Sequence, residues 1–440
     1  MEYNDEKRNI ILTATGDIFI TRKLSPYTEP AYAELWDIFQ SGDIRFTNLE
    51  MLIHEFAGHP VAESGGTYTQ VDPTIVKELE WAGFNLISRA NNHTLDYSVE
   101  GLRRTSELLD QAGFCHAGAG ENLADARSPR YLDLNEGRVG FLSACSSFAS
   151  FGRAGEQRPD LIGRPGLNPV RYKTYYVVGE EHMAQLRTVS ESIGNEERKR
   201  YAIQNGWIKP DKEGELILAG ARFVLGERSG IYTEVDKSDL EGNVKWINDA
   251  RRQSDFVVYS MHWHEGGDIS ETPAMFHQGF ARACIDAGVD AFIGHGPHIL
   301  RGIELYKDKP IFYSLGNFVF QNETVRKLPA DVYERTELDH HATPADYYDK
   351  RSDGDKKGFP AKDKYWQSVL PWCRYEGGKL VELKLYPVAL GYGKPRTVRG
   401  RPLLAKGELA EEIIEQITAL SRPFGTEITF QDGIGLVKLS

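Results

Sequence analysis

Short apolar runs alternate with segments of helical periodicity along much of the chain. Residues 10–15 (IILTAT) and 256–261 (FVVYSM) are apolar runs of strand length, which predict buried strands. Residues 73–83 and 274–288 carry apolar side chains at helical spacing and end at a glycine, which predicts helices. The same patterns predict strands at 43–47, 84–88, 137–145, 290–293 and 311–315, helices at 98–113 (with Ser98 as N-cap) and 239–252, and a C-terminal strand, helix (407–421) and β pair. This alternation indicates an α/β layer fold.

Polar residues recur immediately after the predicted strands. In open α/β sheets, ligands bind beyond the carboxyl ends of the strands, so these positions are candidates for a site. The five clusters are Gly16-Asp17, Asn48-Leu49-Glu50, Asn91-Asn92-His93 with Asp96, His262-Trp263-His264-Glu265, and Gly294-His295-Gly296-Pro297-His298. Taken singly, each is consistent with a turn or a helix cap. Their co-occurrence at strand ends favours a shared site.

The five clusters offer carboxylates, a side-chain amide and imidazoles. These are the ligands of divalent ions such as Zn²⁺, Mn²⁺ or Fe²⁺, and one or two ions are expected. Glu50 is the best candidate for a carboxylate that bridges two ions. His93 is a candidate for the acid that protonates a leaving group, and Asp96 for the carboxylate that orients it. Trp263 and Phe318 are expected to serve packing.

Two long stretches interrupt the alternation within what we expect to be a single domain spanning residues 1–440. Residues 148–235 contain glycine and proline before two helix-like segments, and are expected to form an insertion that shapes the pocket. Residues 327–365 are rich in charge, histidine and glycine, and are expected to form a solvated, mobile loop or lid. His340 and His341 fall in this second stretch and are expected to be solvated.

Composition narrows the possible partners. The formal net charge of −12 argues against nucleic acid and against an anionic membrane surface, which require basic faces. It is compatible with an anionic substrate, because a metal ion inverts the local field. Residues 1–9 are polar and no long apolar run occurs, so neither a signal peptide nor a membrane span is expected, and the protein is expected to be cytoplasmic. The four cysteines form no CxxC pair and are expected to be reduced.

Several motifs, in this order, resemble the CapA family of capsule and poly-γ-glutamate biosynthesis proteins, part of the calcineurin-like metallophosphoesterase superfamily. They are ATGDIFI, FTNLE, ISRANNHTLDYSVEGL, HAGAGENLADAR, MHWHEGG, IGHGPHILRGIE and YSLGNFVF. The resemblance implies a metallophosphatase-like, four-layer α/β/β/α sandwich with loop insertions. It also implies metal ligation by Asp17, Glu50, Asn92, His262, His295 and His298, with His93 and Asp96 as catalytic residues. Candidates for substrate contacts are Asn48, His264, Glu265 and Asn317.

The chain departs from the family patterns at two places. Phosphoesterases of the superfamily usually have a histidine two residues after the first aspartate, and this chain has Phe19 there. One metal site therefore lacks a ligand, which implies a single ion or a weaker second one. His264 stands where the CapA pattern normally has glycine, and Glu265 comes one position early. Either residue is a candidate for an added metal ligand or a substrate contact.

Two functions are compatible with these observations. The first is a metal-dependent hydrolase, in which activated water attacks a phosphoester or an amide of the γ-glutamyl type. The second is a non-hydrolytic accessory or binding protein in the biosynthesis of an anionic polymer or a small molecule. The expected partner is a small or oligomeric anionic substrate, with no nucleic acid and no membrane. The sequence leaves the oligomeric state open.

Overall fold

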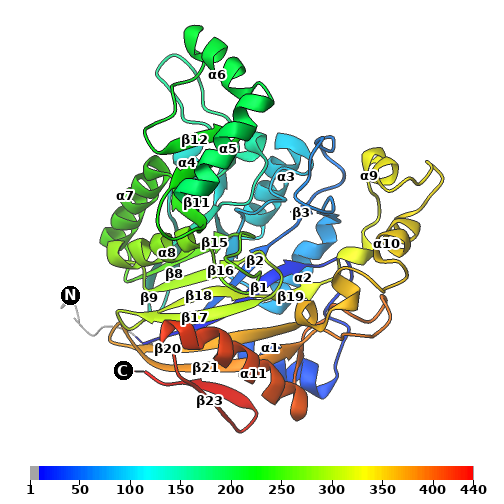
Figure 1. Cartoon of the computed structure of the whole chain (residues 1–440). Coiled ribbons are helices and arrows are strands. Elements are labelled where there is room, and N and C mark those ends of the chain that lie inside the picture. The colour runs from blue at the N-terminus through cyan, green and yellow to red at the C-terminus, as the bar shows by residue number, and fades with distance from the viewer. Residues whose placement is uncertain (1–8, 440) are drawn as a thin grey trace.

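Two β-sheets face each other at the centre of the computed structural model, which describes residues 9–439 (Figure 1). The first sheet has ten strands, in the order β23-β24-β21-β20-β1-β2-β5-β6, with β19 beside β1 and β22 beside β21. Their bounds are β1 Ile10–Phe19, β2 Ile44–Leu49, β5 Leu86–Ser88, β6 Cys115–Ala117, β19 Asn317–Phe320, β20 Gln367–Glu376, β21 Lys379–Ala389, β22 Leu403–Leu404, β23 Ile428–Gln431 and β24 Ile434–Val437.

The second sheet has six strands, in the order β17-β18-β16-β15-β9-β8. Their bounds are β8 Arg130–Leu134, β9 Gly137–Cys145, β15 Phe256–His262, β16 Ala291–His295, β17 Leu300–Tyr306 and β18 Lys309–Leu315. Strands β9, β15, β16 and β18 are parallel, as are β1, β2, β5 and β6 in the first sheet. The carboxyl ends of parallel strands therefore gather along one edge of each sheet, which is where ligands bind in α/β folds.

Apolar side chains from both sheets form the layer between them. Leu12 and Phe46 of the first sheet share one buried cluster with Phe141, Val258 and Phe312 of the second. These strands read as nearly continuous apolar runs because both faces of each sheet are covered.

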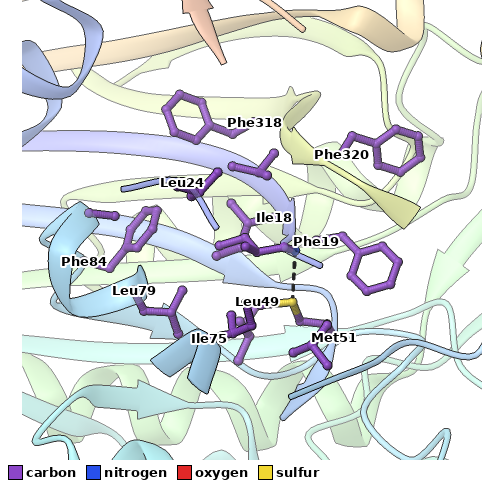
Figure 2. Packing of buried hydrophobic residues seen from close by; sticks show 14 of the residues in the cluster. Ile18, Phe19, Leu24, Leu49, Met51, Ile75, Leu79, Phe84, Phe318 and Phe320 are labelled. Atoms are coloured by element: carbon purple, nitrogen blue, oxygen red, sulfur yellow. Dashed lines mark hydrogen bonds between the residues drawn. The ribbon is translucent and has the colours of Figure 1, made fainter. Parts of the chain in front are cut away.

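Helices cover the two outer faces. The helices α1 (Pro30–Gln40), α2 (Val76–Ala82, after a 3₁₀ turn at Pro73–Ile75) and α3 (Ser98–Gln111) lie on the side of the first sheet. Figure 2 shows Leu79 of α2 and Phe84 packing with Ile18, Leu49 and Phe318 from the strands. The helices α7 (Lys237–Gln253) and α8 (Met275–Ala287) cover the second sheet, and α11 (Glu408–Ser421) packs against β17 and β21. The expected four-layer α/β/β/α sandwich is confirmed.

Most predicted elements are present, with shifted ends. The strand predicted at 10–15 continues through Asp17 to Phe19, because its end is also paired with β19. Ser98 was expected to be the N-cap of α3, but it is the first residue of the helix. Its backbone has a φ of 61°, and the N-cap is Tyr97, which makes no side-chain capping bond. The Ser98 hydroxyl bonds to Tyr97 O and Glu100 instead.

Residues 148–235 fold into a small sheet with two helices that project from one end of the sandwich, at the top of Figure 1. The sheet has the order β12-β13-β11-β14. The bounds are η2 Ser150–Gly152, β10 Gly166–Leu167, β11 Tyr172–Val178, α5 Glu180–Ser192, α6 Asn195–Gln204, β12 Glu215–Leu218, β13 Ala221–Leu225 and β14 Gly230–Val235. Before this segment, α4 (Leu123–Arg127) follows β7 (Ala119–Gly120), and β3 (Leu52–Ile53) pairs with β4 (Gln70–Val71).

Residues 327–365, which were expected to form a solvated, mobile loop or lid, contain regular helical structure. They contain α9 (Ala330–Arg335), α10 (Pro344–Ser352) and two 3₁₀ turns, Phe359–Ala361 and Asp363–Trp366; a further turn, Asn322–Thr324, precedes them. Val332, Tyr347 and Tyr348 are buried in the same apolar cluster as α1 and α2, which anchors the segment. His340 and His341 are exposed, as expected.

Among the described residues, every helix is too short or too polar to cross a bilayer. The polar start, on which the expectation of no signal peptide rests, lies almost entirely outside those residues. All four cysteines are free thiols, and three of them are buried (Cys145, Cys284 and Cys373). Trp263 and Phe318 are fully buried in the apolar core, as expected.

Candidate metal centre

The ends of β1, β2, β15 and β16 bring the polar clusters of the sequence together. Pairing between strands places Asp17 opposite Asn48 and also opposite Asn317, and His262 opposite His295. Gly16 permits the close approach on which this depends, since a Cβ there would lie 1.8 Å from the Gly316 carbonyl oxygen. The candidate residues therefore meet where the two sheets converge.

One group of potential ligands, called cluster one here, consists of Asp17, His262 and His295. The Asp17 Oδ1 atom lies 3.4 Å from His295 Nδ1 and 3.8 Å from His262 Nδ1, and the two Nδ1 atoms are 3.0 Å apart. All three side chains are buried. Two imidazoles and a carboxylate are a ligand set typical of catalytic zinc sites and of non-haem iron sites.

Neighbouring groups hold the residues of cluster one in place. Asn48 Nδ2 donates to Asp17 Oδ1 (2.8 Å), and the Gly296 backbone N–H donates to Oδ2 (2.9 Å). The Ser260 hydroxyl bonds to His295 Nε2 (2.7 Å), which leaves Nδ1 directed at Asp17. A hydrogen bond of this kind fixes the tautomer and orientation of a metal-binding imidazole.

A second group, cluster two, consists of Glu50, His264 and His298. Glu50 Oε2 lies 3.6 Å from His298 Nδ1. The backbone of His264 is fixed at both ends, because its N–H donates to Ser147 Oγ (2.7 Å) and its carbonyl accepts from Arg301 Nη2 (3.2 Å). Like cluster one, it combines two imidazoles with one carboxylate.

The two clusters adjoin. His262 Nε2 lies 2.9 Å from His264 Nε2 and 3.8 Å from Glu50 Oε1, while its Nδ1 belongs to cluster one. Asp17 Oδ2 lies 3.7 Å from His298 Nδ1. Asp17 and His262 therefore contact both clusters, whereas sequence reasoning gave the linking position to Glu50.

His298 holds its position in cluster two at a conformational cost. Its φ of 61° is in the left-handed region, where residues other than glycine are uncommon. Asn317 Oδ1 contacts His298 Nδ1 (2.8 Å), and Asn317 Nδ2 donates to the Tyr365 carbonyl (3.0 Å). Strained backbone of this kind is concentrated at functional sites.

The protonation states suit cation binding. Burial, together with the charges of neighbouring histidines, lowers the pKa of His262 well below its usual value and that of His264 to about 3. Burial also lowers the pKa of His298. These imidazoles are therefore neutral at pH 7 and keep a lone pair for a metal ion. Burial raises the pKa of Asp17, but the hydrogen bond and charge of His295 outweigh it and hold the pKa below its usual value.

Unsatisfied buried atoms mark the space between the clusters. Glu50 Oε1 has no hydrogen-bond partner among the described residues, although Glu50 is 3% exposed. Burial and the charges of Asp17 and Asp96 raise its pKa well above the usual value. A divalent ion beside Glu50 would supply a partner for Oε1 and would favour the charged form of the carboxylate. The donor set and the unsatisfied oxygen thus fit a metal centre.

His93 and Asp96 form a pair beside cluster two. His93 Nδ1 lies 2.7 Å from Asp96 Oδ2, which also accepts from the Thr69 backbone N–H (2.8 Å). The other ring nitrogen, Nε2, lies 3.9 Å from Glu50 Oε1. The adjacent Asn92 has a buried Oδ1 without a hydrogen-bond partner among the described residues, which leaves it free to accept from a ligand or bind an ion.

A cavity of about 290 Å³ opens onto cluster two. Its walls include all three residues of cluster two and the His93 ring, whereas the residues of cluster one lie behind it. The remaining lining residues are Phe19, Gly65, Gly66, Thr67, Thr69, Asn92, Pro297, Phe320, Asn322, Arg351, Phe359 and Tyr365. None of them comes from residues 148–235, so the expected role of that segment in shaping the pocket is not seen at this cavity.

Of the four expected substrate contacts, only His264 lines the cavity. Asn48 and Asn317 are buried and hold Asp17 and His298 respectively. Glu265 accepts from the hydroxyls of Ser146 (2.7 Å) and Ser147 (2.9 Å), so it supports the loop that carries His264. Asn48, Asn317 and Glu265 therefore hold candidate metal ligands in position and do not face the cavity.

Sequence reasoning missed several residues that position or line the site. Ser260 had a usable signal, because it lies two residues before His262 in a strand and so points to the same face. Ser147 and Arg301 had none, since they reach His264 from distant elements. Arg351 lies in the segment that was expected to be solvated.

Comparison with known proteins identifies the family of this chain. Residues 11–322 match the family described as bacterial capsule synthesis protein PGA_cap. The chain belongs to the PGA_cap family. An uncharacterised protein (y4sH) of Sinorhizobium fredii is 38% identical over 97% of this chain and 93% of its own length. The CapA capsule biosynthesis protein of Bacillus anthracis is 25% identical over 73% of this chain and 62% of its own length. A Mycobacterium tuberculosis protein named "probable polyglutamine synthesis accessory protein" is 25% identical over 64% and 57%.

Membership of the PGA_cap family confirms the resemblance to CapA proteins. The structure shows where the two departures from the family patterns lie. Phe19 lines the cavity and packs in the apolar cluster of Figure 2, so it offers no ligand. His264 joins Glu50 and His298 and completes a three-residue group.

Proposed function

We propose that this protein is a metal-dependent hydrolase that cleaves a phosphoester or an amide of the γ-glutamyl type. The observation that carries the proposal is the adjacency of two ligand groups to the His93–Asp96 pair at one cavity. A divalent ion bound there supplies polarisation of a phosphoryl or carbonyl oxygen and lowers the pKa of water. The chain's own residues hold the ligands in place and handle the proton.

Cluster one is assigned the firmly held ion, and cluster two the ion next to the substrate. Asp17, His262 and His295 would hold the first in a fully buried setting. Glu50, His264 and His298 would hold the second at the cavity wall, which the substrate can reach.

His93 is assigned the general acid. Its Nδ1 faces Asp96, so Nε2 is directed toward the cavity and donates a proton to the leaving oxygen or nitrogen. Asp96, held by the Thr69 backbone, fixes the ring in this orientation.

A non-hydrolytic accessory role is the second candidate. The observation in its favour is that relatives of this chain are named as capsule biosynthesis and accessory proteins. In that case the same cavity binds an anionic polymer or a small molecule without cleaving it.

One experiment separates the two roles. Metal content is measured by elemental mass spectrometry for the wild type and for Glu50→Ala, in parallel with turnover of p-nitrophenyl phosphate and γ-glutamyl-p-nitroanilide under added Zn²⁺, Mn²⁺ or Fe²⁺. The hydrolase predicts bound transition metal, turnover of at least one substrate, and loss of both in the variant. Bound metal with no turnover supports the accessory role. Absence of metal in the wild type, even with these ions added, would refute the hydrolase and leave the accessory role.

A further inference from the structure

A second cavity, of about 170 Å³, adjoins the one that opens onto cluster two. The two share four lining residues, Asn322, Arg351, Phe359 and Tyr365. The second cavity is otherwise lined by Glu323, Tyr348, Ser352, Lys357, Gly358, Pro360 and Lys362. The charge of Glu323 is paired with Arg399. A ligand whose reacting end lies at cluster two therefore has room to extend past Arg351.

Arg351 stands at the junction of the two cavities without a carboxylate partner. Its Nη1 donates to Thr67 Oγ1 (2.8 Å) and Tyr347 Oη (3.2 Å), which are both neutral. No ion pair of Arg351 is found within residues 9–439, whereas Arg396 and Arg399 on the neighbouring loop are each paired with acidic residues. An unpaired guanidinium beside a cavity, in a chain of net charge −12, is a binding group for an oxyanion.

The helix that carries Arg351 is held firmly. Thr343 and Asp346 form a capping box at the start of α10, and Tyr347 and Tyr348 are buried in the apolar cluster below it. The Tyr348 hydroxyl also donates to the Asn322 carbonyl. The backbone that carries the guanidinium is thus fixed, and the hydrogen bonds to Thr67 and Tyr347 restrict the exposed side chain before a ligand binds.

An unsatisfied acceptor lies at the same junction. Asn322 is 7% exposed, and its Oδ1 has no hydrogen-bond partner among the described residues. A buried acceptor of this kind is satisfied by an N–H or O–H group of a ligand. The junction therefore offers a positive charge and a hydrogen-bond acceptor a short way from the cluster.

We propose that Arg351 and Asn322 form a subsite that binds an oxyanion of the substrate, a carboxylate or a phosphate, next to an N–H or O–H group and away from the bond that is cleaved. The remainder of the substrate lies in the second cavity, along Phe359 and Tyr365. The proposal deepens the proposed function and rests on it for the position of the reacting end. It makes Arg351 a binding residue that selects anionic substrates.

The test measures binding of inorganic phosphate and of glutarate by calorimetry, with metal-loaded and metal-free protein. Arg351→Gln should weaken binding of the preferred anion roughly tenfold or more in both forms, because a charge-assisted contact is lost. Arg351→Lys should recover part of that loss, since lysine keeps the charge but not the planar fork. The preferred probe distinguishes a phosphate subsite from a carboxylate subsite.

Two further variants exclude a purely structural role. Arg200→Gln removes an exposed arginine on α6 that lines neither cavity, and should leave anion affinity unchanged. Thr67→Val breaks the contact between α10 and the loop at Thr67 and should weaken binding far less than Arg351→Gln does. Unchanged affinity in Arg351→Gln, an equal loss in Thr67→Val, or loss of bound metal in Arg351→Gln would overturn the proposal.

The outcome is independent of whether the protein is a hydrolase. Anion binding that depends on Arg351 in a protein without turnover supports the subsite and refutes the hydrolase. Turnover whose KM for anionic substrates does not change in Arg351→Gln refutes the subsite alone.

Discussion

Clusters one and two each combine two imidazoles with one carboxylate, but they differ in burial and in access to the cavity. The residues of cluster one are sealed behind the cavity, and its carboxylate oxygens both accept hydrogen bonds from the chain, from Asn48 and the Gly296 backbone. Cluster two forms part of the cavity wall, contains an unsatisfied Glu50 oxygen and depends on the strained backbone of His298.

This difference indicates a division of labour. A preorganised, buried group of ligands binds an ion tightly because little rearrangement is needed, whereas a strained and accessible group leaves room for substrate. Under the proposed function, cluster one would anchor the metal centre and cluster two would meet the substrate. Each prediction below tests one side of this contrast.

The largest effect is expected from Asp17→Asn, because Asp17 belongs to cluster one and also contacts His298. Both ions should be lost, and turnover should fall roughly 10⁴-fold, which corresponds to several kcal/mol of activation free energy. Elemental analysis and steady-state kinetics measure these changes, with Asp37→Asn on the exposed face of α1 as control. Retention of two ions would remove Asp17 from its linking position.

His93→Gln should lower turnover roughly 10³-fold while metal content stays at the wild-type level. The reason is that His93 faces the cavity beside Glu50 but belongs to neither cluster. Metal analysis and kinetics on the same preparation test this. If metal is lost along with activity, His93 is a ligand and cluster two has a fourth member.

His264→Gly should release the ion of cluster two and spare that of cluster one. Loss of a residue that merely orients a ligand weakens metal binding roughly 10–100-fold, and loss of the ligand itself at least as much. Metal titration should therefore change from two sites to one. Equal weakening of both sites would show that the two clusters are not independent.

Ser260→Ala and Asn317→Ala form a matched pair, since each removes the polar partner of one histidine. Ser260 bonds to His295 in cluster one, and Asn317 to His298 in cluster two. Each variant should weaken its own site about tenfold and leave the other unchanged. The contrast between the clusters fails if Ser260→Ala affects only the cavity-side ion.

The smallest effect concerns His54, a buried histidine outside both clusters whose two ring nitrogens lack partners among the described residues. Burial lowers its pKa to about 4. Between about pH 6.5 and 4 the unfolded chain therefore binds a proton that the folded one does not. The free energy of unfolding should therefore decrease as the pH is lowered through this window, by less than about 1.4 kcal/mol per pH unit.

Because His54 belongs to neither cluster, this pH dependence should be the same with and without a chelator. It thus separates a histidine that affects stability alone from those of the two clusters. Urea unfolding of wild type and His54→Leu between pH 7 and 4.5 measures it, and the variant should show the flatter curve. Parallel curves would show that His54 does not contribute to the pH dependence.

The sequence alone was sufficient for the layers and for the chemical types at the site. Alternating apolar runs and helical periods predicted an α/β layer fold, because burial on both faces of a sheet leaves a strong local pattern. The four-layer sandwich was implied by the family resemblance. The strand-end clusters predicted Asp17, Glu50, His262, His295 and His298 as neighbours, since parallel strands end on a common edge. Charge-rich composition misled at residues 327–365, where two buried tyrosines decide the structure.

Only the tertiary structure decided how the ligands divide into two clusters and which polar residues hold them. Gly296 reaches Asp17 across 279 positions of sequence, and Asn48 and Asn317 reach it from opposite sides. The position of Arg351 beside cluster two likewise depends on how α10 docks on the first sheet's apolar cluster. Local pattern fixes which face a side chain occupies, but distances between side chains depend on how layers pack, and that packing is set by the whole core at once.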